Sequence, residues 1–302
     1  MTTLAQETVQ GVPASLRRGS LSARRRITDQ VVRLLIWFAL LLAVVPLGLV
    51  VYYVLLKGGH MLSWEFFTAR IPRQARTAGG GMGPAIIGTL LITGLAALMA
   101  IPLGVLGAIY LNEYGKQAPL ARIIRTMSDV MTGVPSIVMG LFIYLAFVLI
   151  TGEQNGFAGA LALACLMLPV VIRTSEEMLR LVPDELRQAS LALGARKWRT
   201  VVTVVLPAAI SGIMSGALLA IARAAGETAP IVLVVGTTVR PNWSLFHGGN
   251  TALPAQIFSN AAQPFQPAVD RAWGAALTLV IVVLIVTLIG RFIAARFAIK
   301  ER

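Results

Sequence analysis

The sequence predicts an all-α polytopic membrane protein with six transmembrane helices and both termini in the cytoplasm. Hydrophobic residues make up 57% of the chain and charged residues 13%, and the mean hydropathy is +0.78. Several apolar runs reach about twenty residues, the length a helix needs to cross the hydrocarbon core of a bilayer. The loops on one side of the predicted spans carry nineteen Lys and Arg residues and those on the other carry six. This asymmetry places both ends in the cytoplasm.

Residues 1–33 form a basic tail, and the apolar run 34–56 is the first expected span. Its length and the lack of a small-residue cleavage site argue against a secretory signal. The tail's arginines fit an orientation signal, and they could also touch anionic lipid. The second, third and fourth spans are expected at about 84–110, 130–150 and 157–172, and the fourth is expected to extend past Arg173. The fifth span is expected after Val201 and the sixth at about 273–290.

This reading divides the chain into four parts. A basic cytoplasmic tail (1–33) precedes the first transmembrane helix and an external loop (34–83). A transmembrane core then extends over 84–290 and contains a cytoplasmic helix at 183–194, and a basic cytoplasmic C-terminal segment covers 291–302. The excess of basic residues follows the loops that flank apolar spans, so it indicates membrane topology and not nucleic-acid binding.

The external loops give no sign of a metal or nucleotide site. The glycine run 79–83 is expected to be a flexible hinge, because no strand precedes it and no Lys-Ser/Thr follows it. The segment 241–267 is rich in Asn, Gly and Pro and is expected to be ordered only by contact with other parts of an assembly. His60 and His247 lack neighbouring Cys, Asp or Glu at ligand spacing, so we expect no metal. Cys165 is the single cysteine, and no disulfide within the chain is possible.

The chain also lacks the motifs of an enzyme. None of its four lysines belongs to a Gly-x-x-x-x-Gly-Lys-Ser/Thr loop, and no Ser/His/Asp or His-x-x-Glu-His arrangement occurs. We therefore expect no catalytic residues and no cofactor in this chain.

A charged island interrupts the apolar sequence at 173–207 and contains a short amphipathic helix. Pro183 suits the first helical turn, Asp184 and Glu185 favour the positive end of the helix dipole, and Gly194 suits the position after the helix. Its apolar residues share one stripe at helical spacing: Leu186, Ala189, Ala192 and Leu193. A solvated loop helix is one interpretation, and a docking element for another protein is the other.

Arg223 and Glu227 are the informative charges within the apolar sequence. They stand at i and i+4 and can pair on one helix face. If the membrane begins at Val201, they lie near the outer surface; if it begins at Leu206-Pro207, the span runs to about Val235 and Arg223 falls near the midplane. We favour the second placement, in which Arg223 must face protein or a water-filled path. The pair is then either a structural lock or a gated cation on an anion's route, with Gly226 and Pro230 loosening the helix locally.

Small residues recur every four positions before this pair and predict a close-packing stripe for a neighbouring helix. They are Ala208, Gly212, Gly216 and Ala220, with Ser211 and Ser215 beside them.

The island resembles the cytoplasmic loop with the Glu-Ala-Ala motif of ABC-transporter permeases. The family pattern is Glu-Ala-Ala, three residues, Gly, nine residues, Ile, one residue and Leu-Pro. Every spacing holds here, with Gln, Ser and Val replacing the Glu, the second Ala and the Ile. The matching residues are Gln188, Ala189, Ser190, Gly194, Val204, Leu206 and Pro207.

Over about 84–290 the chain is similar to phosphate-uptake permeases of the PstA type. The likeness rests on Asn112-Glu113-Tyr114, on 132–142, on Arg223-Ala-Ala-Gly-Glu-Thr-Ala-Pro230 and on 253–258. It implies a type I ABC importer (MetI-like) fold in a bacterial inner membrane and a passive half-channel that moves phosphate by alternating access. Arg223 and Glu227 match the family's signature pair on the phosphate path. Glu185, Gln188, Ala189, Ser190, Gly194, Leu206 and Pro207 would couple the chain to its ATPase.

The resemblance also implies partners. These are a second permease of the PstC type, two copies of a cytoplasmic ATPase of the PstB type that binds the ATP, and an external phosphate-binding protein of the PstS type. The residues leave alternatives open: a permease for molybdate or sulfate, an ion-coupled secondary transporter, or a membrane scaffold or sensor with a structural charge pair.

Overall fold

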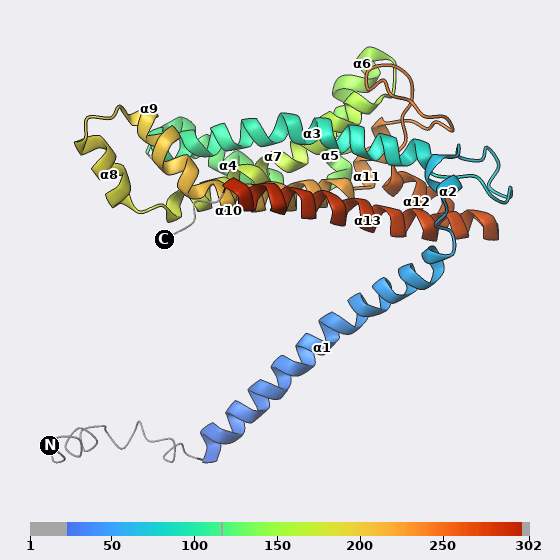
Figure 1. The fold of residues 1–302 in the computed structure, drawn as a ribbon, viewed down its shortest axis with the longest axis horizontal. Helices are drawn as coiled ribbons and strands as arrows, with labels where there is room; N and C mark the ends of the chain where they lie inside the picture. Colours follow the sequence, from blue (N-terminus) through green and yellow to red (C-terminus); the bar gives the residue numbers. More distant parts are fainter. Residues whose placement is uncertain (1–22, 116, 298–302) are drawn as a thin grey trace. The chain divides into compact units, whose positions relative to one another are not determined.

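The computed structural model describes residues 23–115 and 117–297, and no strand occurs within these ranges (Figure 1). The predicted all-α class is confirmed. Much of the predicted basic tail (1–22) and the end of the basic C-terminal segment (298–302) lie outside the described residues.

The chain divides into two compact units, the first reaching Tyr53 and the second starting at Val54. Helix α1 (Ala23–Gly59) supplies the regular structure described in the first unit and continues into the second. Its segment Ile27–Gly59 contains a stretch of 18 residues with a mean hydropathy of 2.9 and is long enough to cross a membrane, as the run 34–56 predicts.

Within the described residues, four further segments are long and apolar enough to span a membrane, and a bent pair of helices makes a possible sixth span. The fourth span extends past Arg173 as predicted. The four segments are Gly83–Tyr114, Gly156–Leu181, Lys197–Ala225 and Gln266–Arg296, and the bent pair is Pro119–Gly133 with Ser136–Thr151.

The helices of the second unit follow one another with short connections. Three π-helical turns, Tyr110–Tyr114, Tyr144–Val148 and Val201–Val205, extend or join them. The α-helices are α2 (Trp64–Thr68), α3 (Gly83–Ile109), α4 (Pro119–Gly133), α5 (Ser136–Ile143), α6 (Leu149–Thr151), α7 (Gly156–Leu181), α8 (Asp184–Ala192), α9 (Lys197–Thr200), α10 (Leu206–Ala225), α11 (Ala229–Val234), α12 (Leu253–Ala261) and α13 (Gln266–Phe297).

The third predicted span, 130–150, begins at the wrong place. α4 ends at Gly133, the chain bends by 108°, and α5 starts at Ser136. Pro135 has no N–H to continue the helix, and it forces Val134 into an extended conformation (φ −73°, ψ 128°). The apolar residues from Val130 onward therefore belong to two differently directed helices.

Helix α7 packs against both α3 and α10 through small residues. A Cβ added to Gly104 of α3 would lie 2.6 Å from Val171 of α7. A Cβ added to Gly212 of α10 would lie 2.2 Å from Met178 of α7, and one added to Gly216 would lie 2.4 Å from Thr174 of α7. The predicted close-packing stripe is confirmed at Gly212 and Gly216, which let α10 approach α7 closely, and at the buried Ala220, whereas Ala208 is exposed.

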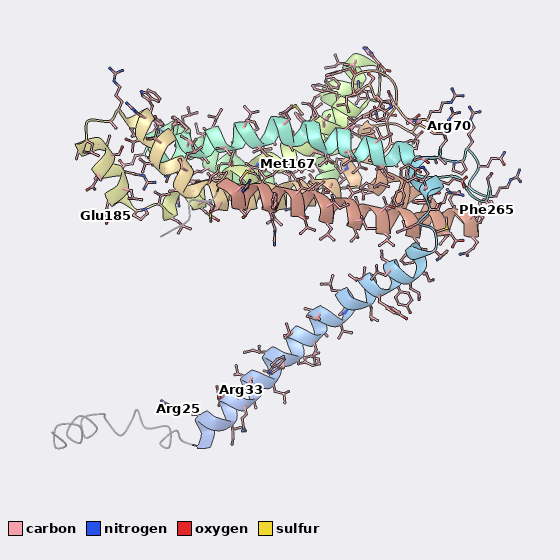
Figure 2. All side chains as sticks on the ribbon, viewed as in Figure 1. Arg25, Arg33, Arg70, Met167, Glu185 and Phe265 are labelled. Carbon is pink, nitrogen blue, oxygen red and sulfur yellow. The ribbon has the colours of Figure 1, made fainter. Side chains whose placement is uncertain are left out.

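Within the second unit, the long helices α3, α7, α10 and α13 run side by side, with α8 and α9 beyond one end of them and α2 at the other (Figure 1). Figure 2 shows Glu185 at the first end, and Arg70 and Phe265 at the opposite end. By the predicted topology, the end with α8 is cytoplasmic and the end with α2 is external.

The glycine run before α3 is closely packed from Gly80 onward, which corrects the prediction of a flexible hinge for that part, whereas Gly79 is exposed. Gly79 and Gly80 have positive φ angles of 75° and 76°, a conformation that favours glycine. A Cβ on Gly81 would lie 2.6 Å from the carbonyl oxygen of Phe66, and the side chain of Met82 is buried. The glycines let the loop turn closely around α2.

The external segment 241–267 is likewise ordered by contacts within the chain, contrary to the prediction. Asn242 donates to the carbonyl oxygen of His247 at 2.9 Å, and the Asn250 side chain accepts from the backbone of Gly156 at 3.0 Å. The backbone N–H of Leu253 donates to Thr89 of α3 at 2.8 Å. Side-chain amides and a hydroxyl supply the partners that a segment outside regular structure needs.

Replacing Gly88 by Ala should destabilise the protein by about 1–3 kcal/mol, because its Cβ would lie 1.8 Å from the carbonyl oxygen of Thr251. Gly94→Ala is the matched control on the same helix, since a Cβ there meets nothing within 4 Å. Thermal unfolding of the purified variants, followed by size-exclusion chromatography, measures the difference. Equal stability of the two variants would contradict the packing of α3 against this segment.

Candidate functional site

Arg223 and Glu227 lie at the break between α10 and α11. Arg223 occupies the last turn of α10, Gly226 caps the helix, and Glu227 follows in the connection. Nε of Arg223 is 3.7 Å from Oε1 of Glu227, which is longer than a hydrogen bond. The Arg223 side chain is 69% exposed and that of Glu227 19%. The pair is therefore loose, and most of the guanidinium surface is accessible.

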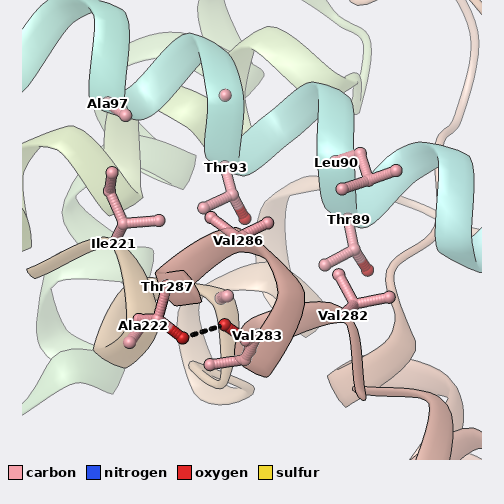
Figure 3. A pocket seen from close by; sticks show the side chains of 12 residues that line it. Thr89, Leu90, Thr93, Ala97, Ile221, Ala222, Val282, Val283, Val286 and Thr287 are labelled. Carbon is pink, nitrogen blue, oxygen red and sulfur yellow. Dashed lines mark hydrogen bonds between the residues drawn. The ribbon is translucent and has the colours of Figure 1, made fainter. Parts of the chain in front are cut away.

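The residues next to Arg223 in the chain show how far along α3 and α13 it lies. Ile221 and Ala222 line a cavity of about 260 Å³ with residues of α3, among them Thr93, and of α13, among them Val283 (Figure 3). Thr93 is the eleventh residue of the span Gly83–Tyr114, and Val283 the eighteenth of Gln266–Arg296. Arg223 thus lies well inside the length of both helices. In its own span, Lys197–Ala225, Arg223 is the twenty-seventh of 29 residues, so the predicted span from Leu206 to about Val235 with Arg223 near its middle is not found.

The fifth span ends at Ala225 and does not run on to Val235 as one helix. After the break at 226–228, α11 packs against α5: a Cβ on Gly140 of α5 would lie 2.6 Å from Cα of Pro230. Ile231, Val234 and Val235 are buried in the core. The apolar residues after Pro230 therefore belong to the core, and the break leaves Glu227 outside a helix.

The predicted docking helix is α8, and its surface is open. Gly194 has a φ of +80°, and its N–H donates to the carbonyl oxygen of Leu191 at 2.9 Å, which ends the helix. Leu193 is 90% exposed, and Leu186 and Leu191 are also exposed. Large apolar side chains gathered on one exposed element mark an interaction surface.

The seven predicted coupling residues are not all on this surface. Glu185, Gln188, Ala189 and Gly194 are exposed on or next to α8. Ser190 instead contacts the hydroxyl of Thr200 at 2.9 Å. The other two, Leu206 and Pro207, are half-buried at the start of α10. The motif therefore combines a free face with residues that attach this face to the transmembrane core.

Arg187 anchors α8 to the ends of α3 and α7, and sequence reasoning missed it. Its guanidinium is 2.9 Å from the carboxylate of Glu113, and the two side chains are only 13% and 6% exposed. It also donates to the carbonyl oxygens of Leu179 at 2.8 Å and Val182 at 2.5 Å. Asn112 donates to the same Glu113 oxygen at 2.8 Å. We call Arg187 and Glu113 the α8 latch.

A second buried carboxylate joins α4 to α7. Glu176, 3% exposed, accepts from Arg125 of α4 at 2.9 Å and from Arg180 at 2.6 Å. Arg125 also donates to the carbonyl oxygen of Leu111 at 2.9 Å. Arg187 and Glu113 are 74 residues apart and Arg125 and Glu176 are 51 apart, so no spacing pattern could have paired them. Glu113 did stand in one of the motifs that carry the family resemblance.

Across residues 23–115 and 117–297, no three His, Cys, Asp or Glu side chains are grouped so as to hold a metal ion. The arrangement supplies an accessible cation at a level within the length of α3 and α13, and an exposed helix at the end of the unit.

The comparisons with known proteins agree with this arrangement. The family model for "Binding-protein-dependent transport system inner membrane component" matches residues 100–300. The chain is 44% identical over 285 residues to "Phosphate transport system permease protein PstA 1" of Mycobacterium tuberculosis (strain CDC 1551 / Oshkosh), covering 91% of this chain and 92% of the relative. It is 39% identical to "Phosphate transport system permease protein PstA" of Yersinia pestis, again covering 91% and 92%.

The fold also matches a solved structure, an inward-facing conformation of the MetNI methionine ABC transporter. The TM-score is 0.57 at 21% identity, over 72% of this chain and 94% of that one. The predicted importer-type fold is confirmed.

Replacing Arg187 by Met should destabilise the protein by about 3–5 kcal/mol, because Glu113 would remain buried without its counter-charge. Arg187→Met combined with Glu113→Met should recover most of that loss, since an apolar pair can replace a buried ion pair. Thermal unfolding of the purified single and double variants measures both effects.

Arg173→Met is the control for this prediction. Arg173 pairs with Glu177 at 3.3 Å, and both side chains are more than half exposed, so its loss should cost no more than about 1 kcal/mol. An Arg187→Met protein as stable as Arg173→Met would show that the latch contributes little.

Proposed function

Since the chain belongs to the family of binding-protein-dependent transport system inner membrane components, and is the permease component of a phosphate ABC transport system, we propose that phosphate passes Arg223 by alternating access. As a multi-pass inner-membrane protein it is a non-catalytic component, and ATP is bound and hydrolysed by another subunit. Phosphate crosses chemically unchanged.

The exposure of Arg223 within the bundle carries this proposal. An arginine inside the length of membrane-spanning helices has to face protein or water, because the hydrocarbon core disfavours its charge by roughly 2.5–3.5 kcal/mol. Its side chain is 69% exposed in this chain and only loosely paired with Glu227 at 3.7 Å. A planar guanidinium matches the oxygens of phosphate with two parallel hydrogen bonds. Glu227 holds the arginine when no anion is present and releases it when phosphate arrives.

The partners complete what one chain lacks. A second permease of the PstC type provides the other wall of the route, which covers the exposed side of Arg223. Two copies of a cytoplasmic ATPase of the PstB type supply the driving force, and one of them docks on α8. An external binding protein of the PstS type delivers phosphate to the opposite end.

The α8 latch transmits the movement of the ATPase to the transmembrane helices. None of the residues of α8 is buried, so apolar packing holds it only weakly. Arg187 instead binds the ends of α3 and α7 together, while the contact between Ser190 and Thr200 links α8 to α9. α9 continues through a π-helical turn into α10, which carries Arg223. Closure of the ATPase dimer thus shifts α8, and the attached helices rock with it.

Arg223→Gln should abolish phosphate uptake, because glutamine keeps much of the size and loses the charge and the two-pronged donor. Uptake of radiolabelled phosphate by cells that carry only the variant permease measures this. The variant should assemble normally with its ATPase. Uptake at the normal rate would remove Arg223 from the route.

Arg173→Gln is the matched control for the loss of an arginine. This side chain is exposed in the C-terminal half of α7 and pairs with Glu177. Uptake should remain close to normal in this variant.

Ala189→Glu should release the ATPase, because it places a charge on the exposed apolar face of α8. Loss of about 1.4 kcal/mol of binding free energy corresponds to a tenfold weaker complex, and co-purification of the ATPase from solubilised membranes measures it. Gly194→Glu should act similarly, with added strain at a φ of +80°.

Ala262→Glu introduces the same charge at an exposed position after α12, at the other end of the unit, and should leave the complex intact. Unchanged co-purification with Ala189→Glu would argue against α8 as the docking helix.

A further inference from the structure

A polar hollow opens at the external end of the second unit. It has a volume of about 430 Å³ and lies between the loop at 71–75, the segment 237–239, α12 and the start of α13. Arg73 and Arg271 line it together with hydroxyl and amide side chains, among them Thr237, Ser259 and Gln256. No Asp or Glu is among its lining residues. We call it the external hollow, and the residues that line it carry positive charge and no negative charge.

Arg271 is the buried charge of this wall. It is 1% exposed. Its guanidinium donates to the carbonyl oxygens of Thr77 at 2.6 Å and Ala75 at 2.8 Å, and its Nε has no hydrogen-bond partner. The neighbouring carboxylate of Asp270 accepts instead from Gln266 at 2.8 Å. Among the described residues, Arg271 forms no ion pair. The charge of Asp270 acts on Arg271 without forming an ion pair with it. A buried cation with an unpartnered Nε and no ion pair favours an anion beside it.

We propose that the external hollow binds phosphate before it enters the route past Arg223. This inference rests on the proposed function, because it takes phosphate as the transported anion. The two arginines supply charge, and the hydroxyl and amide groups can donate to phosphate oxygens. Along α13, Arg271 precedes Val283 by twelve residues, or about 18 Å at 1.5 Å per residue. The hollow therefore lies outward from the level of Arg223, where phosphate would arrive from a binding protein.

The size of the hollow favours a hydrated small anion that binds weakly. One water takes about 30 Å³ of liquid volume, so 430 Å³ accommodates a phosphate ion with several waters. A transport pathway requires binding that is favourable enough for entry and weak enough for exit. A phospholipid head group has the same phosphate chemistry, and the experiment separates the two sources.

The bound anion would also affect the loop before α3. Arg271 holds this loop through the carbonyl oxygens of Ala75, Thr77 and Gly79. Phosphate beside Arg271 would compete with these carbonyl oxygens for the guanidinium. Binding of phosphate in the hollow would therefore weaken the hydrogen bonds that hold the loop before α3.

The test is protection of a cysteine placed in the wall. Ser259→Cys, in a background with Cys165→Ala, is made in the whole transporter complex in phosphatidylcholine nanodiscs, without ATP or binding protein. The rate of its modification by N-ethylmaleimide is measured by mass spectrometry at increasing phosphate concentration. Phosphate at ten times its dissociation constant should slow the modification about tenfold by mass action.

Arg73→Gln should weaken this protection, and Arg76→Gln is its matched control. Both arginines are exposed on the same loop, but Arg73 lines the hollow whereas Arg76 bonds to Gln74 at 3.1 Å. Arg271→Gln would also release the loop, so the control pair avoids it. A modification rate independent of phosphate, or equal loss of protection in both variants, would overturn the proposal.

The same assay in nanodiscs with phosphatidylglycerol distinguishes the lipid. Slow modification that free phosphate does not change would assign the hollow to a head group and overturn the proposal. The experiments distinguish an incorrect external hollow from an incorrect proposed function. Arg223→Gln should abolish uptake and leave the protection at position 259 intact, whereas loss of uptake without any phosphate protection would refute only the external hollow.

Discussion

The close approach of α7 to α3 and α10 is the constraint on which the rest of the second unit depends. Lipid tails are as apolar as the side chains they would replace, so helices in a membrane associate chiefly through van der Waals packing. Gly104, Gly212 and Gly216 leave room for Val171, Met178 and Thr174 of α7. With these three helices held at short distance, their ends are fixed as well. The buried charges at the cytoplasmic end can then meet with accurate geometry.

Those charges are worth more as a rigid connection than as a source of stability. A buried ion pair loses hydration that its attraction only partly restores, so it is retained where it specifies one arrangement. Glu113 and Glu176 are both buried, and each is bound by one arginine from another element, Arg187 of α8 and Arg125 of α4 respectively. They tie α8 and α4 to the bundle. The outer face of α8 remains exposed, which is the combination a lever between two subunits requires.

Arginines at two levels of the unit have opposite environments. Arg271 is enclosed and holds a loop through carbonyl oxygens, whereas Arg223 is largely exposed and loosely paired. Because Arg271 is enclosed, its positive charge is fixed in place. Because Arg223 is exposed, its guanidinium can change partners. An anion that moves inward would meet the fixed charge first and the mobile one later.

The sequence by itself determined the helical membrane class, the extended fourth span, the glycine stripe and the presence of the helix α8. These follow from apolar run length, residue size at helical spacing and local capping, which all act between neighbours in the chain. It also singled out Arg223 and Glu227, because charges within apolar sequence are rare.

Only the tertiary structure decided the bend at Pro135, the packing of α11, the ordered external loops and the partners of Arg187, Arg271 and Glu176. A proline signals a break but not whether the two pieces stay in line, and glycines signal freedom as readily as close contact. Arg125 and Glu176 lie 51 residues apart, and Arg271 and Ala75 lie 196 residues apart. Such pairs form because packing brings distant backbone and side-chain atoms together, and no local pattern records that.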